Sequence, residues 1–297
     1  MSSLKEIRTR IASVKSTRKI TSAMKMVAAA KLKKAQDAVL NLRPYANKLY
    51  GIMIDIARGL EGEEIATEYL REPKDNGGKV LIVVITSNKG LCGAFNSSVI
   101  KKCVDLANDK YAKELERGDL YFYTIGRKGT EFFQSKGYKV YDSNDDILEK
   151  ATFNNVVPIV QSIMDKFKEK EFERVEIVYN KFKNAAVYLL THDHFLPIDL
   201  SIENGEEKEN HYDYIYEPGK IEIVENLIPN ILRTQFYDAI LESLAAEHGA
   251  RMTAMHKATD NATDLIKELQ LTYNKARQAA ITSEISEVVS GAEALRK

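Results

Sequence analysis

The sequence predicts an α/β domain inserted between two long terminal helices that pair as an antiparallel coiled coil. Residues 3–57 and 226–297 carry apolar side chains at steps of three and four, which is typical of long helices with one buried stripe. Residues 79–217 instead alternate short apolar runs with helical segments, which indicates a Rossmann-like, mostly parallel sheet covered by helices. We therefore expect a shaft of residues 1–58 and 226–297 and an α/β foot domain of residues 79–217.

The first helix is predicted from a stripe that starts near the N-terminus. Its members are Leu4, Ile7, Ile11, Val14, Ile20, Met24, Val27, Leu32, Ala35, Val39 and Leu42. Pro44 would usually end or kink a helix, but apolar residues resume at Leu49, so we expect a kinked continuation. Gly59 and Gly62 mark its end.

The foot is predicted from apolar runs that alternate with helical segments. The expected strands are residues 79–86, 120–125, 174–179 and 185–196, and the expected helices are about 95–116, 127–136 and 154–170. The last two strands are expected to form a hairpin across residues 182–184, which gives the sheet an antiparallel edge. Residues 60–78 and 201–210 are expected to be loops.

The last helix is predicted from forty residues of apolar or small side chains in steps of three and four. They are Leu241, Leu244, His248, Met252, Met255, Ala258, Ala262, Ile266, Leu269, Tyr273, Ala276 and Ala280. At 1.5 Å per residue the segment from Asn230 spans roughly 100 Å, longer than the first helix by roughly 20 Å. The extra length carries its own stripe of Ile281, Ile285, Val288, Ala292 and Leu295. An apolar stripe on an unpaired helix end needs a partner.

Composition restricts the function classes. The formal net charge is zero, yet residues 1–50 hold twelve Lys and Arg residues against two acids, Glu6 and Asp37. Cys92 and Cys103 are too few for a disulfide framework, which favours a reducing compartment. No apolar run reaches the roughly 18 residues that a membrane span needs.

Few residues indicate a catalytic, ligand-binding or metal-binding site. Residues 90–93, Gly-Leu-Cys-Gly, follow a strand and precede a helix, a context that can bind phosphate. The complete glycine fingerprints are missing, so a structural turn is the better interpretation. His192 and His194 share one face of a strand, but no third metal ligand is evident. We therefore expect no catalytic, cofactor-binding or metal site.

Two other function classes are compatible with parts of the sequence. The basic first helix suits nucleic-acid binding, although it has almost no aromatic residues before Tyr45. A dinucleotide-dependent enzyme built on the α/β block lacks the glycine fingerprint and leaves both long helices unexplained. The nucleic-acid-binding coiled coil is the main alternative.

Four separated segments resemble the gamma subunits of F-type ATP synthases of bacteria. They are residues 6–28, residues 87–96, residues 246–255 with 273–279, and residues 281–292. The last segment resembles the family's C-terminal pattern, I-T-x-E-x-x-E-x-x-x-G-A. The family usually has Asp where this chain has Asn88. The resemblance covers nearly the whole chain.

The resemblance implies a non-catalytic central-stalk rotor that couples proton flow to ATP synthesis or hydrolysis. The shaft would stand inside a ring of α and β subunits, and the foot would bind the ε subunit and the c-ring. This placement implies a peripheral protein on the cytoplasmic face of the cell membrane, with no nucleic acid and no small-molecule substrate. The residues that the resemblance and the tip stripe together place against the ring are Met24, Arg277, Gln278, Thr282, Glu284, Ile285 and Val288.

Overall fold

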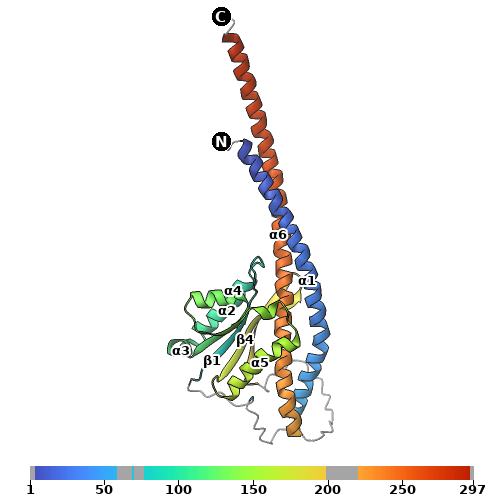
Figure 1. Cartoon of the computed structure of the whole chain (residues 1–297), viewed down its shortest axis with the longest axis vertical. Coiled ribbons are helices and arrows are strands. Elements are labelled where there is room, and N and C mark those ends of the chain that lie inside the picture. The colour runs from blue at the N-terminus through green and yellow to red at the C-terminus, as the bar shows by residue number, and fades with distance from the viewer. Residues whose placement is uncertain (1–3, 59–68, 70–76, 199–219, 295–297) are drawn as a thin grey trace. The chain divides into compact units, whose positions relative to one another are not determined.

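The computed structural model describes residues 4–58, 69, 77–198 and 220–294 (Figure 1). The expected loops 60–78 and 201–210 lie almost wholly outside the described residues. The chain divides into two compact units. We call residues 1–28 with 251–297 the helix-pair unit and residues 29–250 the sheet unit. The long helices α1, Leu4–Arg58, and α6, Lys220–Ala294, contribute to both units.

The sheet unit contains a five-stranded sheet in the order β3-β2-β1-β4-β5. Its strands are β1 Val80–Ile85, β2 Leu120–Ile125, β3 Val140–Asn144, β4 Arg174–Asn184 and β5 Val187–Leu196. All neighbouring pairs are parallel except β4 and β5, which form the antiparallel hairpin. The predicted Rossmann-like sheet with an antiparallel edge is confirmed.

Three local predictions were wrong. Strand β4 continues to Asn184, so the hairpin turns at residues 185–186 and not across 182–184. The Asn184 side chain fixes this turn, because its Oδ1 accepts hydrogen bonds from the backbone N–H groups of Ala186 and Val187 at 3.0 and 2.9 Å. The helix expected over 95–116 is broken into α2, Phe95–Asn108, and α3, Ala112–Arg117. Strand β3, a polar edge strand, was not predicted.

Helices cover both faces of the sheet (Figure 1). Alternate residues of β1 point to opposite faces, so Leu81, Val83 and Ile85 pack in one core cluster and Val80, Ile82 and Val84 in the other. The first cluster includes helix α5, Phe153–Lys168, and the second includes α2 and α4, Arg127–Ser135.

The first part of α6 belongs to the core of the sheet unit. Its side chains Ile228, Leu232, Phe236, Ala239 and Ile240 are buried with α5 and the sheet. We did not predict this packing. The signal was present, because this segment is apolar on nearly every side, which is typical of a helix buried all round.

The helix-pair unit is an antiparallel coiled coil. On α6 its seam includes Met255, Ala262, Ile266 and Leu269, all buried, and Thr259 donates a hydrogen bond to the Thr21 hydroxyl of α1 at 2.8 Å. On α1 the seam keeps a strict seven-residue repeat. The members are Leu4, Ile7, Ile11, Val14, Arg18, Thr21, Lys25 and Ala28, each buried or half-buried.

The predicted α1 stripe departs from this repeat in its middle. Ile20 and Val27 are each 57% exposed in the isolated chain, whereas Ala28 is 2% exposed. Our prediction followed the larger apolar side chains and left the heptad register. A seam of small and polar residues is shallow, which lets two helix backbones approach closely.

Candidate functional site

The last turns of α6 form the most distinctive surface of the helix-pair unit. The seam residues Tyr273, Ala276 and Ala280 are still half-buried, but every residue from Ile281 to Ala292 is exposed. Among them Ile281, Ile285, Val288 and Val289 are 46%, 59%, 71% and 52% exposed. Figure 1 shows α6 continuing past the first turn of α1 in this unit. We call residues 281–292 the tip.

The apolar side chains of the tip lie on a different side of α6 from the seam. The heptad repeat that places Tyr273, Ala276 and Ala280 in the seam continues to Ser283, Glu287 and Ser290, which are polar. With 3.6 residues per turn, the stripe of Ile281, Ile285, Val288 and Ala292 is rotated about 120° from the seam. The tip is therefore not an unused length of the same coiled coil, because its apolar face points elsewhere.

The structure brings six of the seven predicted interface residues onto one surface. Arg277, Gln278, Thr282, Glu284, Ile285 and Val288 are all exposed on α6. At about 100° per residue they fall within roughly 160° of the helix circumference, together with the tip stripe. The Thr282 hydroxyl donates to the Gln278 carbonyl at 2.9 Å within the helix. The side chains of Arg277, Gln278 and Glu284 are exposed to solvent.

Met24 lies apart from the tip, on α1. It is half-buried, and its neighbours Met26, Val27 and Ile20 are 64%, 57% and 57% exposed. We missed this second apolar surface because Ile20 and Val27 were assigned to the seam. Basic residues border it, including Lys19 and Lys25. Apolar side chains surrounded by positive charge suit a partner with an acidic rim.

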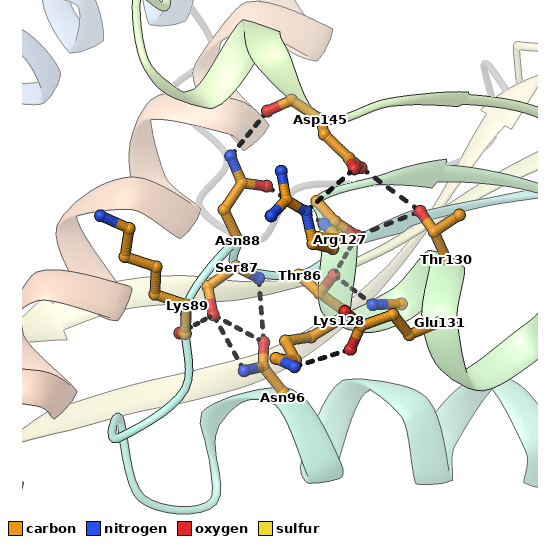
Figure 2. A network of polar contacts seen from close by, with 12 residues as sticks. Thr86, Ser87, Asn88, Lys89, Asn96, Arg127, Lys128, Thr130, Glu131 and Asp145 are labelled. Atoms are coloured by element: carbon orange, nitrogen blue, oxygen red, sulfur yellow. Dashed lines mark hydrogen bonds and ion pairs between the residues drawn. The ribbon is translucent and has the colours of Figure 1, made fainter.

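The glycine-rich turn after β1 closes on itself (Figure 2). The Ser87 backbone N–H donates to Asn96 Oδ1 at 2.9 Å, and the Ser87 hydroxyl donates to the Lys89 carbonyl at 2.8 Å. Leu91 and Gly93 both have a φ of 62°, the left-handed conformation of a tight turn. These bonds make residues 87–93 a structural turn.

The first turn of helix α4 is also satisfied internally. The backbone N–H groups of Arg127, Lys128 and Gly129 donate to Asn88 Oδ1, the Ser87 carbonyl and Thr86 Oγ1 at 3.1, 3.1 and 2.9 Å. These donors are the groups that would otherwise bind a phosphate. The Asn88 amide donates to the Asp145 carbonyl at 2.7 Å, a bond that an ionised aspartate would not make.

His192 and His194 do face one side of β5, and both meet a buried carboxylate. Glu176 of β4 is fully buried and contacts His192 and Tyr111 directly, with Lys110 Nζ at 2.5 Å and His194 Nδ1 at 3.7 Å. Burial alone would raise the pKa of Glu176, but the contacts with His194, Lys110 and Tyr111 outweigh it and lower the pKa to about 2. This cluster joins the hairpin to the segment between α2 and α3.

The described part of the chain shows no metal-binding cluster and no membrane-spanning helix. No three His, Cys, Asp or Glu side chains there are grouped to hold a metal ion. Among the same residues, no helix combines the length and apolarity needed to cross a bilayer. Cys92 and Cys103 are both buried and neither forms a disulfide, and burial raises the pKa of Cys103 far above its usual value.

Comparisons with known sequences match nearly the whole chain to one family. The family model described as ATP synthase matches residues 3–295. A protein of Flavobacterium psychrophilum called ATP synthase gamma chain is 50% identical over 301 residues, with 100% of both chains covered. Another of the same name from Flavobacterium johnsoniae is 52% identical over 297 residues, with 99% of each chain covered.

Solved structures give the same result for the fold. The chain is similar to one in the central stalk and c-ring of the Tetrahymena thermophila mitochondrial ATP synthase. The TM-score is 0.59 and the identity 26%, over 80% of this chain and 99% of that one. A chain of the Euglena gracilis mitochondrial ATP synthase gives a TM-score of 0.66 at 19% identity, over 98% and 94% of the two chains. That second likeness concerns the fold alone.

Proposed function

Because this chain belongs to the ATP synthase family of gamma chains, we propose that it is the central-stalk rotor of an F-type ATP synthase. In this role it couples proton flow through the membrane sector to ATP synthesis or hydrolysis at the catalytic β subunits. It does so by rotating inside a ring of α and β subunits. It has no catalytic site of its own and acts by making different contacts with the different conformations of its neighbours.

The working division of the chain is a shaft of residues 1–58 and 226–297 and a foot of residues 79–217. Its support is that α1 and α6 are each uninterrupted helices, of 55 and 75 residues. The average globular helix has only about 11–12 residues. The start of α6 is buried in a core that it shares with the sheet. This end of the shaft therefore packs directly on the foot.

The tip is the observation that carries the proposal. An exposed stripe of isoleucine and valine on a helix without a neighbour is unfavourable in water and marks a binding surface. The stripe faces away from the coiled-coil seam, so a longer α1 would not cover it. A surrounding collar of other subunits covers all sides of a helix end and accommodates this geometry.

We assign ring contacts to two places. At the tip, Ile285 and Val288 supply the apolar part, and Arg277, Gln278, Thr282 and Glu284 supply hydrogen bonds to loops of the β subunits. On α1, Met24 and its exposed apolar neighbours contact the ring, with the surrounding lysines facing acidic loops of the β subunits. Charge attraction is long-ranged and loosely directional, so it persists at an interface whose partners slide.

The remaining partners follow from family membership. The foot binds the ε subunit and the c-ring, and the protein is peripheral to the cytoplasmic face of the cell membrane. No nucleic acid and no small-molecule substrate is involved. The nucleic-acid-binding alternative fits neither the matched family nor the apolar tip, because phosphate-binding surfaces are polar and basic.

The test is reconstitution with α and β subunits, with this chain present, absent, or carrying Ile285→Ser with Val288→Ser. We expect the complete chain to raise ATPase activity and the double variant to assemble weakly, because its tip no longer buries apolar surface. Ser283→Ala with Ser290→Ala is the matched control, since both serines lie on the opposite face of the tip. An equal loss in the control and the tip variant would contradict the proposal.

A further inference from the structure

The tip of the β4–β5 hairpin is held between the two long helices within the sheet unit. Glu242 of α6 is fully buried, and its Oε2 accepts a hydrogen bond from the backbone N–H of Phe182 at 2.9 Å. Its Oε1 accepts from Arg43 of α1, at 2.7 Å from Nη2 and 3.2 Å from Nε. Arg43 Nη2 also lies 3.4 Å from the Phe182 carbonyl. One carboxylate therefore joins a strand and two helices.

A glycine brings α6 against the turn of the same hairpin. A Cβ atom built on Gly249 would lie 2.9 Å from the Ala185 carbonyl oxygen and 3.5 Å from its carbonyl carbon. A contact of 2.9 Å is too short for a real side chain, so only glycine permits this approach of helix to turn. We call Arg43, Phe182, Ala185, Glu242 and Gly249 the hairpin clamp.

The clamp differs in kind from the other packing of α6 on the sheet. Residues 228–240 of α6 pack mainly through apolar side chains, with one hydrogen bond from Arg233 to Gln161 of α5. Hydrophobic contact is non-directional, so it resists separation more than sliding. A charge-assisted pair of an arginine with a carboxylate fixes both distance and angle. The clamp therefore adds the directional restraint that apolar packing lacks.

The sequence of α1 makes a restraint useful at this place. Pro44 follows Arg43 directly and lies inside α1. A proline within a helix removes one backbone hydrogen bond and weakens the helix locally. Arg43 thus joins α1 to the hairpin and to α6, directly next to the proline that weakens α1.

We propose that the hairpin clamp is a torque-bearing joint, which holds the sheet domain rigidly to both long helices so that twist passes between them. The inference rests on the proposed rotor function. It assigns Arg43, Glu242 and Gly249 as positioning residues that set the torsional stiffness of the rotor and contact no substrate.

Gly249→Ala separates this role from a role in folding. Alanine favours the helix over glycine, so the substitution supports α6 itself. Its methyl group nevertheless pushes against the Ala185 backbone and opens the clamp. Gly51→Ala is the matched control, because Gly51 lies inside α1 and a Cβ atom there meets nothing within 4 Å.

The measurement uses the complex with α and β subunits, fixed through its ring, with a bead on a cysteine that replaces Lys113 of helix α3. In complexes that carry Gly249→Ala or Glu242→Gln, we expect the bead angle to be more broadly distributed at each pause and the stall torque to be lower. Gly51→Ala and Glu116→Gln, an exposed charge on α3, should match the wild type. The Gly249→Ala chain should still fold and assemble with the α and β subunits, which a cooperative melting transition and co-purification of the complex check.

Three results would contradict the proposal that the hairpin clamp is a torque-bearing joint. They are an unchanged angular distribution in both clamp variants, a change of equal size in Gly51→Ala, and failure of Gly249→Ala to assemble where Gly51→Ala assembles. If Glu242→Gln does not fold, Gly249→Ala alone decides. A wild-type complex that hydrolyses ATP without moving the bead would instead refute the rotor function, so the two failures are distinguishable.

Discussion

At the scale of single residues, two buried carboxyl groups of the sheet unit titrate in opposite directions. Glu176 is surrounded by donors and a lysine, which lower its pKa to about 2. Asp238 of α6 is half-buried, and its buried Oδ1 atom has no hydrogen-bond partner among the residues that the structure describes. Burial, followed by the nearby charge of Glu242, raises the pKa of Asp238 to about 6. The two sites therefore give stability opposite dependences on pH.

Glu176→Gln should destabilise the chain at neutral pH. Because the pKa of Glu176 is lowered on folding, its ionised form stabilises the fold above the unfolded value of 4.5, and this is lost as pH falls towards 2. We expect a loss of about 3 kcal/mol at pH 7, because each unit of pKa shift is worth about 1.4 kcal/mol. Urea denaturation at pH 7 and pH 3 measures it. An equal loss at both pH values would contradict the assigned charge interaction.

Asp238→Asn should stabilise the chain, but only where Asp238 is ionised. Its raised pKa means that the folded state loses stability as pH rises from about 4 through 6. The expected gain at pH 7.5 is about 1–2 kcal/mol, reduced from the full shift because the group is partly exposed. Denaturation curves at pH 4 should show no gain. Asp109→Asn, at an exposed position, serves as the control.

At the scale of elements, the sequence predicts strongly periodic or strongly apolar segments and fails elsewhere. Strands β1 and β2 are apolar, β-branched or aromatic runs, and their positions were predicted to within a residue. Strand β3 has only one apolar β-branched residue, Val140, and pairs at the sheet edge, so its strand character comes from its neighbour. The hairpin turn was misplaced because the Asn184 side chain, and not a glycine, fixes it.

The coiled coil shows a second limit of prediction from the hydrophobic pattern. Its heptad positions include Arg18, Thr21 and Lys25, which a hydrophobic pattern does not select, whereas Ile20 and Val27 are apolar and exposed. The tip was predictable because its stripe begins where α1 can no longer pair with α6. The hairpin clamp was not, since it joins residues about 199 positions apart through one carboxylate.

The heptad register makes a direct prediction for the helix-pair unit. Ile266→Ala removes a side chain that is 6% exposed, and we expect a local loss of about 2–4 kcal/mol. Val27→Ala truncates a side chain that is 57% exposed, so it should cost little. Amide hydrogen exchange of residues 4–28 and 251–280 measures both. Faster exchange in Val27→Ala than in Ile266→Ala would refute the register.

At the scale of the whole molecule, the proposed rotor combines three features in one chain. We propose that the tip offers an apolar surface to a surrounding ring, that the exposed patch beside Met24 makes a second contact, and that the hairpin clamp holds sheet and helices together. Helices α1 and α6 each contribute residues to both units. In the proposed function these features give the chain a mechanical role.

Single-molecule rotation tests this role most directly. The complex with α and β subunits is fixed to a surface through the ring, a bead is attached to the foot at position 113, and ATP is added. We predict continuous rotation of the bead in one direction, which stops when ATP is removed. ATP hydrolysis by the same complexes while every bead keeps a fixed orientation would contradict the rotor function.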